Sequence, residues 1–424
     1  MARVLFLTQV LPYPLDAGPK VRAYHMLRHL SGSHEVTLLS FVRDDDAPSS
    51  ISHLRSLCRA VYTVPMRRSM WRNARAAAKG LITGTPIVVA RDEIQEMQAA
   101  VRRLAAELAP QVVHADQLSM AGYGRLAATP AAGRTAPRTV LDEHNAIYLL
   151  TSRMASVEAR GWRRAIMARE AGAFRRYEAR MCRFYDAILT VTREDRDHLL
   201  ALYPAGEREA ASRKFTVVPI CVDPAQVAPV ARALKGPPTI LHLGTMFWPP
   251  NVEGVLWFAR EVLPLVRLAE PDARFVVVGK NPPAEVMALT AEPGVEVTGY
   301  VADVAPYLSS ADAFVAPLHA GGGMRVKILD AWLWGQPVVS TPIGAEGIDI
   351  RDGENILIGA DAAGFAAQVV RLLRDPELNG RVRAAGRAWV ETHYAWKAAY
   401  QQVDRIYAGL LTHGSDCPSA QTVL

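Results

Sequence analysis

The sequence predicts an α/β protein built from two doubly wound, Rossmann-like domains. Its 424 residues exceed what one ordinary core organises, and half of them are hydrophobic. Short runs rich in valine, isoleucine, leucine and threonine alternate with helical stretches in two successive series. Strands buried on both faces of a parallel sheet have this continuous apolar character. A proline-punctuated stretch without periodicity separates the two series, and we interpret residues 223–238 as the interdomain linker.

Each series supplies the strands of one sheet. In the first domain, residues 1–222, we expect strands at Arg3–Thr8, His34–Ser40, Ala60–Val64, Gln111–Ala115, Arg138–Asp142, Asp186–Val191 and Phe215–Pro219. In the second domain, residues 239–395, we expect them at Ile240–Gly244, Phe275–Gly279, Val295–Gly299, Ala313–Leu318, Pro337–Thr341 and Asn355–Gly359. A helical stretch is predicted from Ala362 to Glu391, and a terminal helix over residues 396–412 is expected to pack back on the first domain. Ligands of such sheets bind beyond the carboxyl ends of the strands, so the two domains are expected to face each other across a cleft that holds the site.

Composition excludes several classes of protein. The four cysteines are widely scattered, without a CxxC or a Cys/His cluster, so neither a disulfide framework nor a zinc site is indicated. The apolar run Val4–Leu7 is too short for a signal peptide, and no apolar run reaches the length of a membrane span. We therefore expect a cytoplasmic protein.

The net charge of +6 is concentrated in one segment. Thr151–Arg183 carries nine arginines against three glutamates, with apolar residues such as Trp162 and Tyr177 at helical spacing. This pattern fits a helix that packs on its own domain with a solvated basic face, which is the commoner case. It also fits peripheral contact with the anionic inner face of the cell membrane. No nucleic-acid-binding motif accompanies the charge, so nucleic acid is not an expected partner.

The stretch from Leu318 to Thr341 has the chemistry of a phosphate site. The consecutive glycines Gly321, Gly322 and Gly323 follow an apolar strand and precede a helix, where backbone N–H groups and the helix dipole favour an anion. The cations Arg325 and Lys327 would neutralise that charge. Asp330 lies one helical turn beyond Lys327, so its carboxylate can accept hydrogen bonds from sugar hydroxyls beside the same ligand. A phosphorylated sugar or nucleotide is therefore the expected ligand.

Several stretches together resemble the large retaining glycosyltransferase family usually numbered 4, of the GT-B fold, also described as glycosyl transferases group 1. In the second domain these are LHLGTMFWPPNVEGVLWF, FVVVGKNP, VEVTGYVADVAPYLSSADAFVAPL, GGGMRVKILDAWLWGQPVVST and DGENILI. Looser matches in the first domain are LPYPLDAGPKVRAYHML, VLDEHNAIY and DAILTVTREDRDHL. The resemblance implies an enzyme that moves a sugar from a nucleoside-diphosphate donor to an acceptor hydroxyl, without a cofactor.

The resemblance also implies roles for residues of the second domain. The triple glycine with Arg325 and Lys327 would hold the donor diphosphate, and Gly244 would lie at the donor. Asp330 stands where the family has a glutamate that binds ribose hydroxyls. The family's other glutamate falls on Gly322 here, so the glycine amides either replace its contact with the transferred sugar or activity is impaired. We prefer replacement.

In the first domain the resemblance assigns Gly18 to a loop that closes over the donor diphosphate. It places His144 near the transferred sugar as the catalytic residue, where an imidazole can hydrogen-bond a hydroxyl or stabilise charge. His114 and Asp116 follow another strand end and are expected to line the acceptor side. No catalytic metal is expected, and Asp44-Asp45-Asp46 is interpreted as a charged loop.

The leading hypothesis is a retaining hexosyltransferase of cell-surface polysaccharide or glycoconjugate biosynthesis, acting on a sugar or a lipid-linked acceptor. Two alternatives remain open at this point. One is a nucleotide-sugar epimerase on the same scaffold, and the other is a catalytically degenerate binding partner of an active transferase. A dehydrogenase or a P-loop enzyme is disfavoured because neither GxGxxG nor GxxxxGK[ST] follows a predicted strand.

Overall fold

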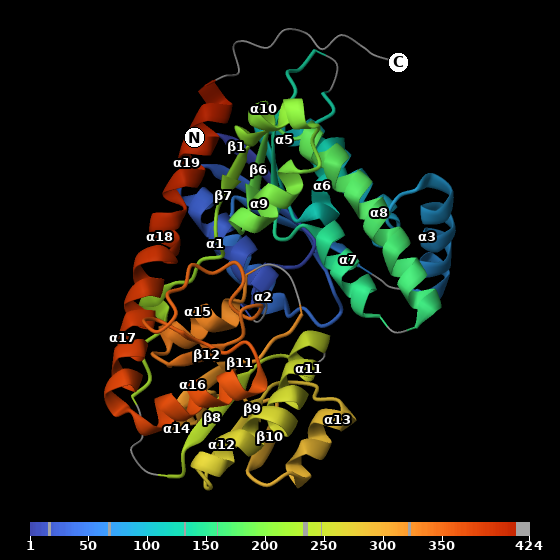
Figure 1. Ribbon diagram of the computed structural model, residues 1–424. Helices are drawn as coiled ribbons and strands as arrows, with labels where there is room; N and C mark the ends of the chain where they lie inside the picture. Colours follow the sequence, from blue (N-terminus) through green and yellow to red (C-terminus); the bar gives the residue numbers. More distant parts are fainter. Residues whose placement is uncertain are drawn as a thin grey trace. The chain divides into compact units, whose positions relative to one another are not determined.

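The computed structural model describes residues 1–15, 18–66, 69–130, 133–158, 160–231, 236–246, 248–320 and 324–412. The chain divides into two compact units, each built around one parallel β-sheet (Figure 1). The first unit comprises Met1–Cys221 and the chain from Ala399 onward, and the second comprises Val222–Ala398. The expected fold class of two parallel-sheet α/β domains is confirmed.

The first unit has a seven-stranded parallel sheet in the order β3-β2-β1-β4-β5-β6-β7. Its strands are β1 (Arg3–Thr8), β2 (Glu35–Val42), β3 (Ala60–Pro65), β4 (Val112–Asp116), β5 (Arg138–Glu143), β6 (Ala187–Thr190) and β7 (Phe215–Val217). The strand order reverses between β1 and β4. Side chains at the carboxyl ends of such neighbouring strands are the usual ligand-binding groups of a doubly wound sheet.

Helices connect these strands. They are α1 (Gly18–Ser33), α2 (Pro48–Leu57), α3 (Met70–Thr83), α4 (Ile87–Asp92), α5 (Gln95–Leu108), α6 (Leu118–Ala127), α7 (Ile147–Val157), α8 (Gly161–Phe184), α9 (Arg193–Leu200), α10 (Arg208–Ser212) and the terminal α19 (Gln401–Thr412). A short 3-10 turn, η1, spans Ala205–Glu207. The basic segment that the sequence suggested as one helix therefore contains two helices, since α7 ends at Val157 and α8 begins at Gly161.

Alternate strand residues build the two faces of the first sheet. Leu7, Ala115 and Leu141 belong to one apolar core together with residues of α5, α6 and α8. The other face carries His114, which hydrogen-bonds Tyr407 of α19. This alternation arises because successive side chains of a strand point to opposite faces of the sheet. Only side chains at strand ends that point to the same face can therefore contact one another.

The second unit has a six-stranded parallel sheet in the order β10-β9-β8-β11-β12-β13. Its strands are β8 (Thr239–Leu243), β9 (Arg274–Val278), β10 (Val295–Gly299), β11 (Ala313–Ala316), β12 (Val338–Ser340) and β13 (Leu357–Ile358). Its helices are η2 (Pro224–Gln226), α11 (Pro249–Trp257), η3 (Phe258–Val262), α12 (Leu263–Ala269), α13 (Ala284–Met287), η4 (Ala288–Ala291), α14 (Ala305–Ser310), α15 (Val326–Leu333), α16 (Ala362–Arg374), α17 (Pro376–His393) and α18 (Trp396–Ala399).

The helical stretch predicted from Ala362 is divided into α16 and α17. Asp375 ends the first helix and caps the second, since its carboxylate accepts a hydrogen bond from the Leu378 N–H at 2.9 Å. Pro376 then occupies the first helical turn, where its missing N–H costs nothing. The stretch expected as a linker also has partners in the second unit: the Val230 N–H donates to the Trp334 carbonyl at 3.0 Å.

No helix in the described part of the chain combines the length and the hydrophobicity that crossing a bilayer requires. The long helix α8 illustrates the reason, because arginines recur along its whole length.

Candidate functional site

In the second unit, the predicted phosphate site lies at the start of α15. Arg325 occupies the N-cap position, Lys327 the first turn, and Asp330 follows one turn later. The helix ends before Gly335, whose φ of 71° is readily adopted by glycine. Gly321, Gly322 and Gly323, which form the predicted backbone cradle, lie outside the described residues.

Lys327 is held at the end of β8 by two side chains. Its Nζ donates to Asn251 Oδ1 at 2.7 Å and lies 3.5 Å from His242 Nε2. His242 Nδ1 lies 2.9 Å from the Val315 carbonyl, which only accepts, so Nε2 is left as an acceptor toward Lys327. Burial, and after it the charge of Arg325, lowers the pKa of Lys327 to about 7. Burial and the neighbouring Arg325 therefore disfavour the charged form of Lys327, and an anionic ligand beside it would restore that charge.

Gly244 is the point where these side chains converge. A Cβ added there would lie 3.0 Å from Lys327 Nζ, 3.0 Å from Asn251 Nδ2 and 3.1 Å from His242 Nε2. Any side chain would therefore crowd the three polar groups. A glycine at this strand end lets the lysine ammonium and the backbone approach the same ligand.

Asp330 has a different environment from Lys327. Burial raises the pKa of its carboxyl to about 7, and no hydrogen bond links it to another residue within the described ranges. A partly buried carboxyl of this kind gains from hydrogen bonds that a ligand brings. Hydroxyl groups of a bound sugar or ribose would supply such donors.

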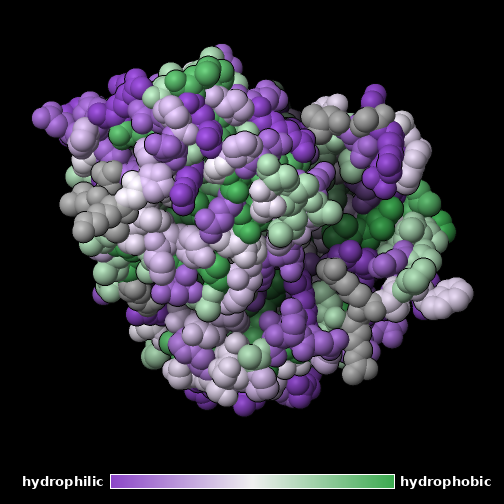
Figure 2. Space-filling model, turned by 90° about the horizontal axis from the view of Figure 1, so that it is seen from below, coloured by the Kyte–Doolittle hydropathy of each residue, from purple (hydrophilic) through white to green (hydrophobic). Residues whose placement is uncertain are grey.

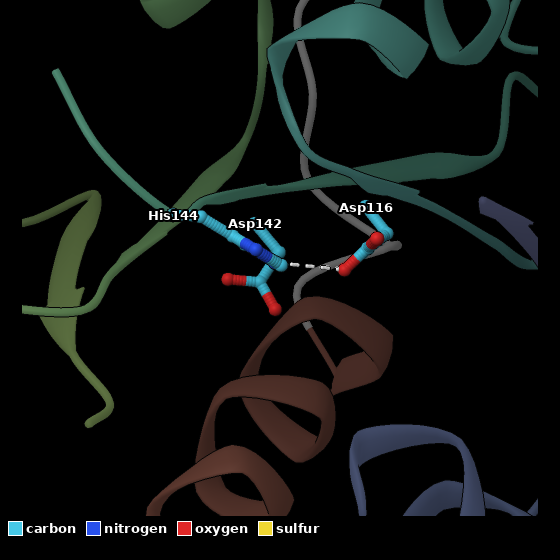
Figure 3. A group of neighbouring side chains, drawn as sticks. All are labelled: Asp116, Asp142 and His144. Atoms are coloured by element: carbon cyan, nitrogen blue, oxygen red, sulfur yellow. Dashed lines mark hydrogen bonds and ion pairs between the residues drawn. The ribbon is translucent and has the colours of Figure 1, made fainter. Parts of the chain in front are cut away.

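In the first unit, the carboxyl ends of β4 and β5 bring three of the polar side chains together. Figure 3 shows the His144 ring and the Asp116 carboxylate facing each other, with Asp142 beside them. His144 Nε2 lies 2.9 Å from Asp116 Oδ1. Since an ionised carboxylate only accepts, Nε2 of a neutral ring carries the proton and Nδ1 remains an acceptor. All three side chains are buried.

Arg22 of α1 neutralises the third member of this cluster. Its Nε and Nη2 donate to Asp142 Oδ1 at 2.9 and 2.5 Å, and its Nη1 donates to the Val218 carbonyl at 2.5 Å. Burial by itself would raise the pKa of Asp142, but the Arg22 guanidinium, His114 and His144 hold it well below its usual range. Asp142 is therefore a buried anion paired with a buried cation.

His114 lies deeper on the same face of the sheet. Its ring stacks on Phe6, with the centroids 4.4 Å apart, and its Nδ1 lies 2.8 Å from the Tyr407 hydroxyl. Its Nε2 is 3.8 Å from Asp142 Oδ2. These contacts make His114 a support for the Asp142 carboxylate.

The opposite face of β5 carries a second buried group of acids that fixes the loop after His144. Glu178 of α8 accepts hydrogen bonds from the Ile147 and Tyr148 N–H groups, at 2.6 and 3.1 Å, and so caps α7. Asp195 accepts from the Ala146 N–H at 2.9 Å. Glu143 is buried beside them. The backbone on the carboxyl side of His144 is thereby anchored at consecutive residues.

These acids make stability depend on pH. Burial, and then the neighbouring carboxylates, raises the pKa of Glu143 well above its ordinary value, and burial raises that of Glu178 to about 8. A carboxyl whose pKa is raised on folding binds its proton more tightly in the folded state. Its stabilisation is complete below the unfolded pKa and is lost as pH rises toward the folded one.

We therefore expect the melting temperature to fall between pH 5 and pH 8, and Glu143→Gln to flatten that fall. The glutamine keeps the size of the side chain but removes its titration. Each kcal/mol recovered at pH 8 should raise the melting temperature by about 2–4 °C for a unit of this size. Differential scanning calorimetry at both pH values measures the difference, and an equal slope in the variant would contradict this account.

Asp116, Asp142 and His144 also form a group whose ligand atoms lie within 4.8 Å of one another, as a metal site would require. Arg22 already donates two hydrogen bonds to Asp142, so a divalent cation would share that carboxylate with a guanidinium. The positive charges of the guanidinium and of the metal ion, both beside one carboxylate, would repel each other. The arrangement favours an organic ligand over a metal ion.

The predicted site residues belong to separate units. His144 and Asp116 meet in the first unit, His114 lies on the same sheet face, and Gly18 begins the helix that carries Arg22. Gly244 and Lys327 meet in the second unit, with Arg325 and Asp330 on the same helix start.

Sequence reasoning missed four side chains that position the predicted ones: Arg22, Asn251, Glu178 and His242. His242 offered a usable signal, because it lies near the end of β8, two residues before Gly244. Asn251 gave none, because a single amide in a helix is not a recognisable motif.

Two family models match the chain. The model described as Glycosyltransferase Family 4 matches residues 17–226, and the model described as Glycosyl transferases group 1 matches residues 237–375. Between them they cover parts of both units and include every predicted site residue.

Curated proteins are similar to parts of the chain. A phosphatidyl-myo-inositol mannosyltransferase of Mycobacterium leprae is 30% identical over 186 residues, which is 42% of this chain and 48% of the relative. An uncharacterized 44.6 kDa protein in the cps region of Klebsiella pneumoniae is 24% identical over 172 residues, 39% of this chain and 44% of the relative. The matched stretches thus span about half the length of these relatives.

Solved structures share the fold over nearly the whole chain. HepE of Anabaena in complex with UDP and glucose has a TM-score of 0.64 at 13% identity, covering 96% of this chain and 100% of that one. Sucrose-phosphate synthase of Thermosynechococcus elongatus has a TM-score of 0.65 at 17% identity, covering 97% and 99%. With the two family models, this likeness identifies the chain as a member of glycosyltransferase family 4 with the GT-B type of fold.

Proposed function

We propose that this protein is a retaining hexosyltransferase that moves a sugar from a nucleoside-diphosphate donor to an acceptor hydroxyl. The observation that carries the proposal is the convergence of Lys327, His242 and Asn251 on Gly244, beside Arg325 at the start of α15. The leaving diphosphate gains charge as the sugar departs, and cations already in place stabilise that charge without reorganisation. Gly18, and the glycines at 321–323, complete the proposed donor site.

His144 is the proposed catalytic residue on the side of the transferred sugar. Asp116 fixes its ring through Nε2, and Glu178 and Asp195 fix the loop behind it. A held imidazole can accept a hydrogen bond from a sugar hydroxyl through Nδ1 without losing rotational freedom on binding. Asp116 and His114 belong to the proposed acceptor side.

Retention without a covalent intermediate is the proposed stereochemical course. A covalent route needs a carboxylate nucleophile at the sugar. Asp142 is paired with Arg22, Asp116 with His144, and Glu143 follows Asp142 directly, so it faces the other side of β5. A displacement in which the acceptor attacks from the face that the diphosphate leaves therefore suits these residues better.

Lipid-linked or glycan acceptors are the proposed substrates, in the building of cell-surface polysaccharides or glycoconjugates. The names of two relatives support this class of acceptor. One is a phosphatidyl-myo-inositol mannosyltransferase, and the other, from Corynebacterium glutamicum, is a GDP-mannose-dependent phosphatidylinositol monomannoside mannosyltransferase. We place the reaction in the cytoplasm, at the inner face of the membrane, with Thr151–Arg183 contributing to the contact.

A ligand panel followed by product analysis tests the proposal. Thermal shifts with UDP, GDP, ADP and their sugars should identify the donor, because a ligand at a hundred times its dissociation constant adds about 2.7 kcal/mol of stability. NMR of the product with a glycosyl acceptor should then show retained configuration. Inversion would refute the mechanism. Isomerisation of the donor alone would indicate an epimerase, and nucleotide binding without turnover a degenerate partner.

Metal removal provides a separate prediction. Turnover should be unchanged after dialysis against EDTA, because Arg325 and Lys327 supply the positive charge that a metal ion supplies elsewhere. Initial rates before and after dialysis, and after return of Mg²⁺ or Mn²⁺, measure this. A loss that only the metal restores would contradict the prediction and would point to the group Asp116, Asp142 and His144.

A further inference from the structure

The residue that follows strand β4 has a strained backbone. Gln117 has a φ of 70° and a ψ of 157°, a combination that almost only glycine adopts without cost. Two other described residues besides the glycines have a positive φ. Ala109 ends helix α5 in the left-handed helical conformation, and Asn281 belongs to a residue type that tolerates a positive φ. Among the described residues, the conformation of Gln117 therefore needs an explanation of its own.

The path of the chain explains why a turn occurs at this position. Ala115 and Leu118 both belong to the apolar core, although residues three apart in a regular strand point to opposite faces. Two backbone hydrogen bonds fix the turn that returns Leu118 to the core: the Gln117 N–H donates to the Asp142 carbonyl at 2.9 Å, and the Met120 N–H donates to the Gln117 carbonyl at 3.0 Å. Glycine would make the same turn without strain, so the chain path does not account for the glutamine side chain.

The side chain of Gln117 lies against the pair that Asp116 forms with His144. Its Nε2 is 3.5 Å from Asp116 Oδ2, while His144 Nε2 lies 2.9 Å from Asp116 Oδ1. A separation of 3.5 Å is too long for a strong hydrogen bond. Within the described ranges, no group donates a hydrogen bond to the amide oxygen Oε1. The carboxamide thus offers both a donor and an acceptor beside the proposed catalytic residue.

Exposure distinguishes Gln117 from its neighbour. Asp116 is completely buried, whereas Gln117 is partly exposed, so a ligand at the carboxyl end of β4 would meet the carboxamide before the carboxylate. Polar groups alone are common on the surface, and Figure 2 shows hydrophilic residues over much of the visible face. Fully exposed groups select ligands poorly, because water satisfies them equally well. A carboxamide on a fixed backbone, beside a buried carboxylate, is in contrast already oriented for binding.

We propose that Gln117 is a specificity-determining residue that binds two neighbouring hydroxyls on one ring of the acceptor, a sugar or a cyclitol. Oε1 would accept a hydrogen bond from one hydroxyl, and Nε2 would donate to the other. The planar amide presents both groups in one direction, which suits an adjacent pair of ring hydroxyls better than an isolated hydroxyl. The proposal rests on the proposed function, in which Asp116 lies on the acceptor side, and it adds what that side recognises.

Binding of single-ring probes to the full chain tests the proposal without requiring sugar transfer. Methyl α-D-mannopyranoside, methyl α-D-glucopyranoside and myo-inositol, which differ in the arrangement of their hydroxyls, are titrated by saturation-transfer NMR with UDP or GDP present. The unaltered chain should bind at least one probe and prefer it to the others. Gln117→Ala should raise the dissociation constant of that probe by about tenfold, the loss expected for two neutral hydrogen bonds, and should weaken the preference.

Gln117→Gly separates recognition of the acceptor from folding. Because the glycine relieves the strained backbone, the melting temperature should rise by about 2–4 °C, while probe binding falls as in Gln117→Ala. Ala109→Gly is the matched backbone control, since it also places glycine at a position with a positive φ. Gln98→Ala is the matched side-chain control, because Gln98 of α5 is likewise a partly exposed glutamine. Both controls should bind the probes like the unaltered chain.

Equal probe binding by Gln117→Ala and the unaltered chain would overturn the proposal, and so would an unaltered chain that binds none of the probes. A lower melting temperature in both Gln117 variants, with probe binding unchanged, would give the side chain a structural role instead. Sugar transfer is measured separately. A chain that binds the probes through Gln117 but transfers no sugar would refute the proposed function alone, so the two failures are distinguishable.

Discussion

Lys327→Ala is expected to lower both the affinity for the donor diphosphate and the rate of transfer by roughly tenfold to over a hundredfold. Hydrogen bonds to charged groups are worth about 1.5–3 kcal/mol, and the ammonium would act both in binding and as the leaving group gains charge. Arg325→Ala should have an effect of the same kind. Isothermal titration with the diphosphate and initial-rate kinetics measure the two quantities.

The pKa of Lys327 gives this prediction a second readout. The pKa is about 7, and a bound diphosphate would raise it. Binding then takes up a proton above pH 7, so affinity should fall as pH rises from 7 to 9, by at most tenfold per pH unit. Lys327→Arg should bind with a flatter pH dependence, since a guanidinium stays charged throughout this range.

Lys397→Ala serves as the control, because Lys397 is an exposed lysine of the same unit. It should leave affinity, rate and pH dependence unchanged. If Lys327→Ala and Arg325→Ala both bound and turned over like the unaltered chain, the start of α15 would not be the diphosphate site.

The strands could be predicted well because most are short, apolar and buried, although β10 contains no buried residue. Thirteen expected strands correspond to β1–β13, and two of them, Arg3–Thr8 and Val295–Gly299, have the expected bounds. Helix breaks were less predictable. The sequence predicted one helical stretch from Ala362 to Glu391, but the side-chain cap at Asp375 ends one helix and begins the next.

The candidate site was predictable only in the residues that form local motifs. Lys327 and Asp330 stand three residues apart, so their common helix face follows from their spacing, and Arg325 is the N-cap residue of the same helix. Lys327 meets Asn251 and His242 across 76 and 85 residues of sequence, and Arg22 meets Asp142 across 120. Such pairs depend on the strand order of the sheet, which one sequence does not specify.

Along α8, the sequence pattern did not distinguish exposed apolar residues from buried ones. The spacing of Trp162, Ile166, Ala173 and Tyr177 predicts a single apolar stripe, yet only the last two are buried. Periodicity shows that side chains share a face but not what covers that face. Trp162 and Ile166, near the start of α8, are exposed instead.

His144→Ala is the second prediction with a large expected effect: turnover should fall by about 10²-fold or more, while affinity for the free nucleoside diphosphate stays nearly unchanged. The reason lies in where the contacts are made. His144 belongs to the first unit, and the cations proposed to hold the diphosphate, Arg325 and Lys327, belong to the second. An interaction realised mainly in the transition state lowers the rate without weakening ground-state binding.

Asp116→Asn separates positioning from direct action at His144. The amide keeps the size of the side chain but loses the charge that orients Nε2 at 2.9 Å. We expect a smaller loss of turnover than for His144→Ala, and in the double variant no further loss beyond that of His144→Ala, because Asp116 would act through the imidazole. Single-turnover rates and diphosphate titrations of the three variants measure this. Additive losses would mean that Asp116 contacts the substrate itself, and normal turnover by His144→Ala would leave the imidazole a structural role only.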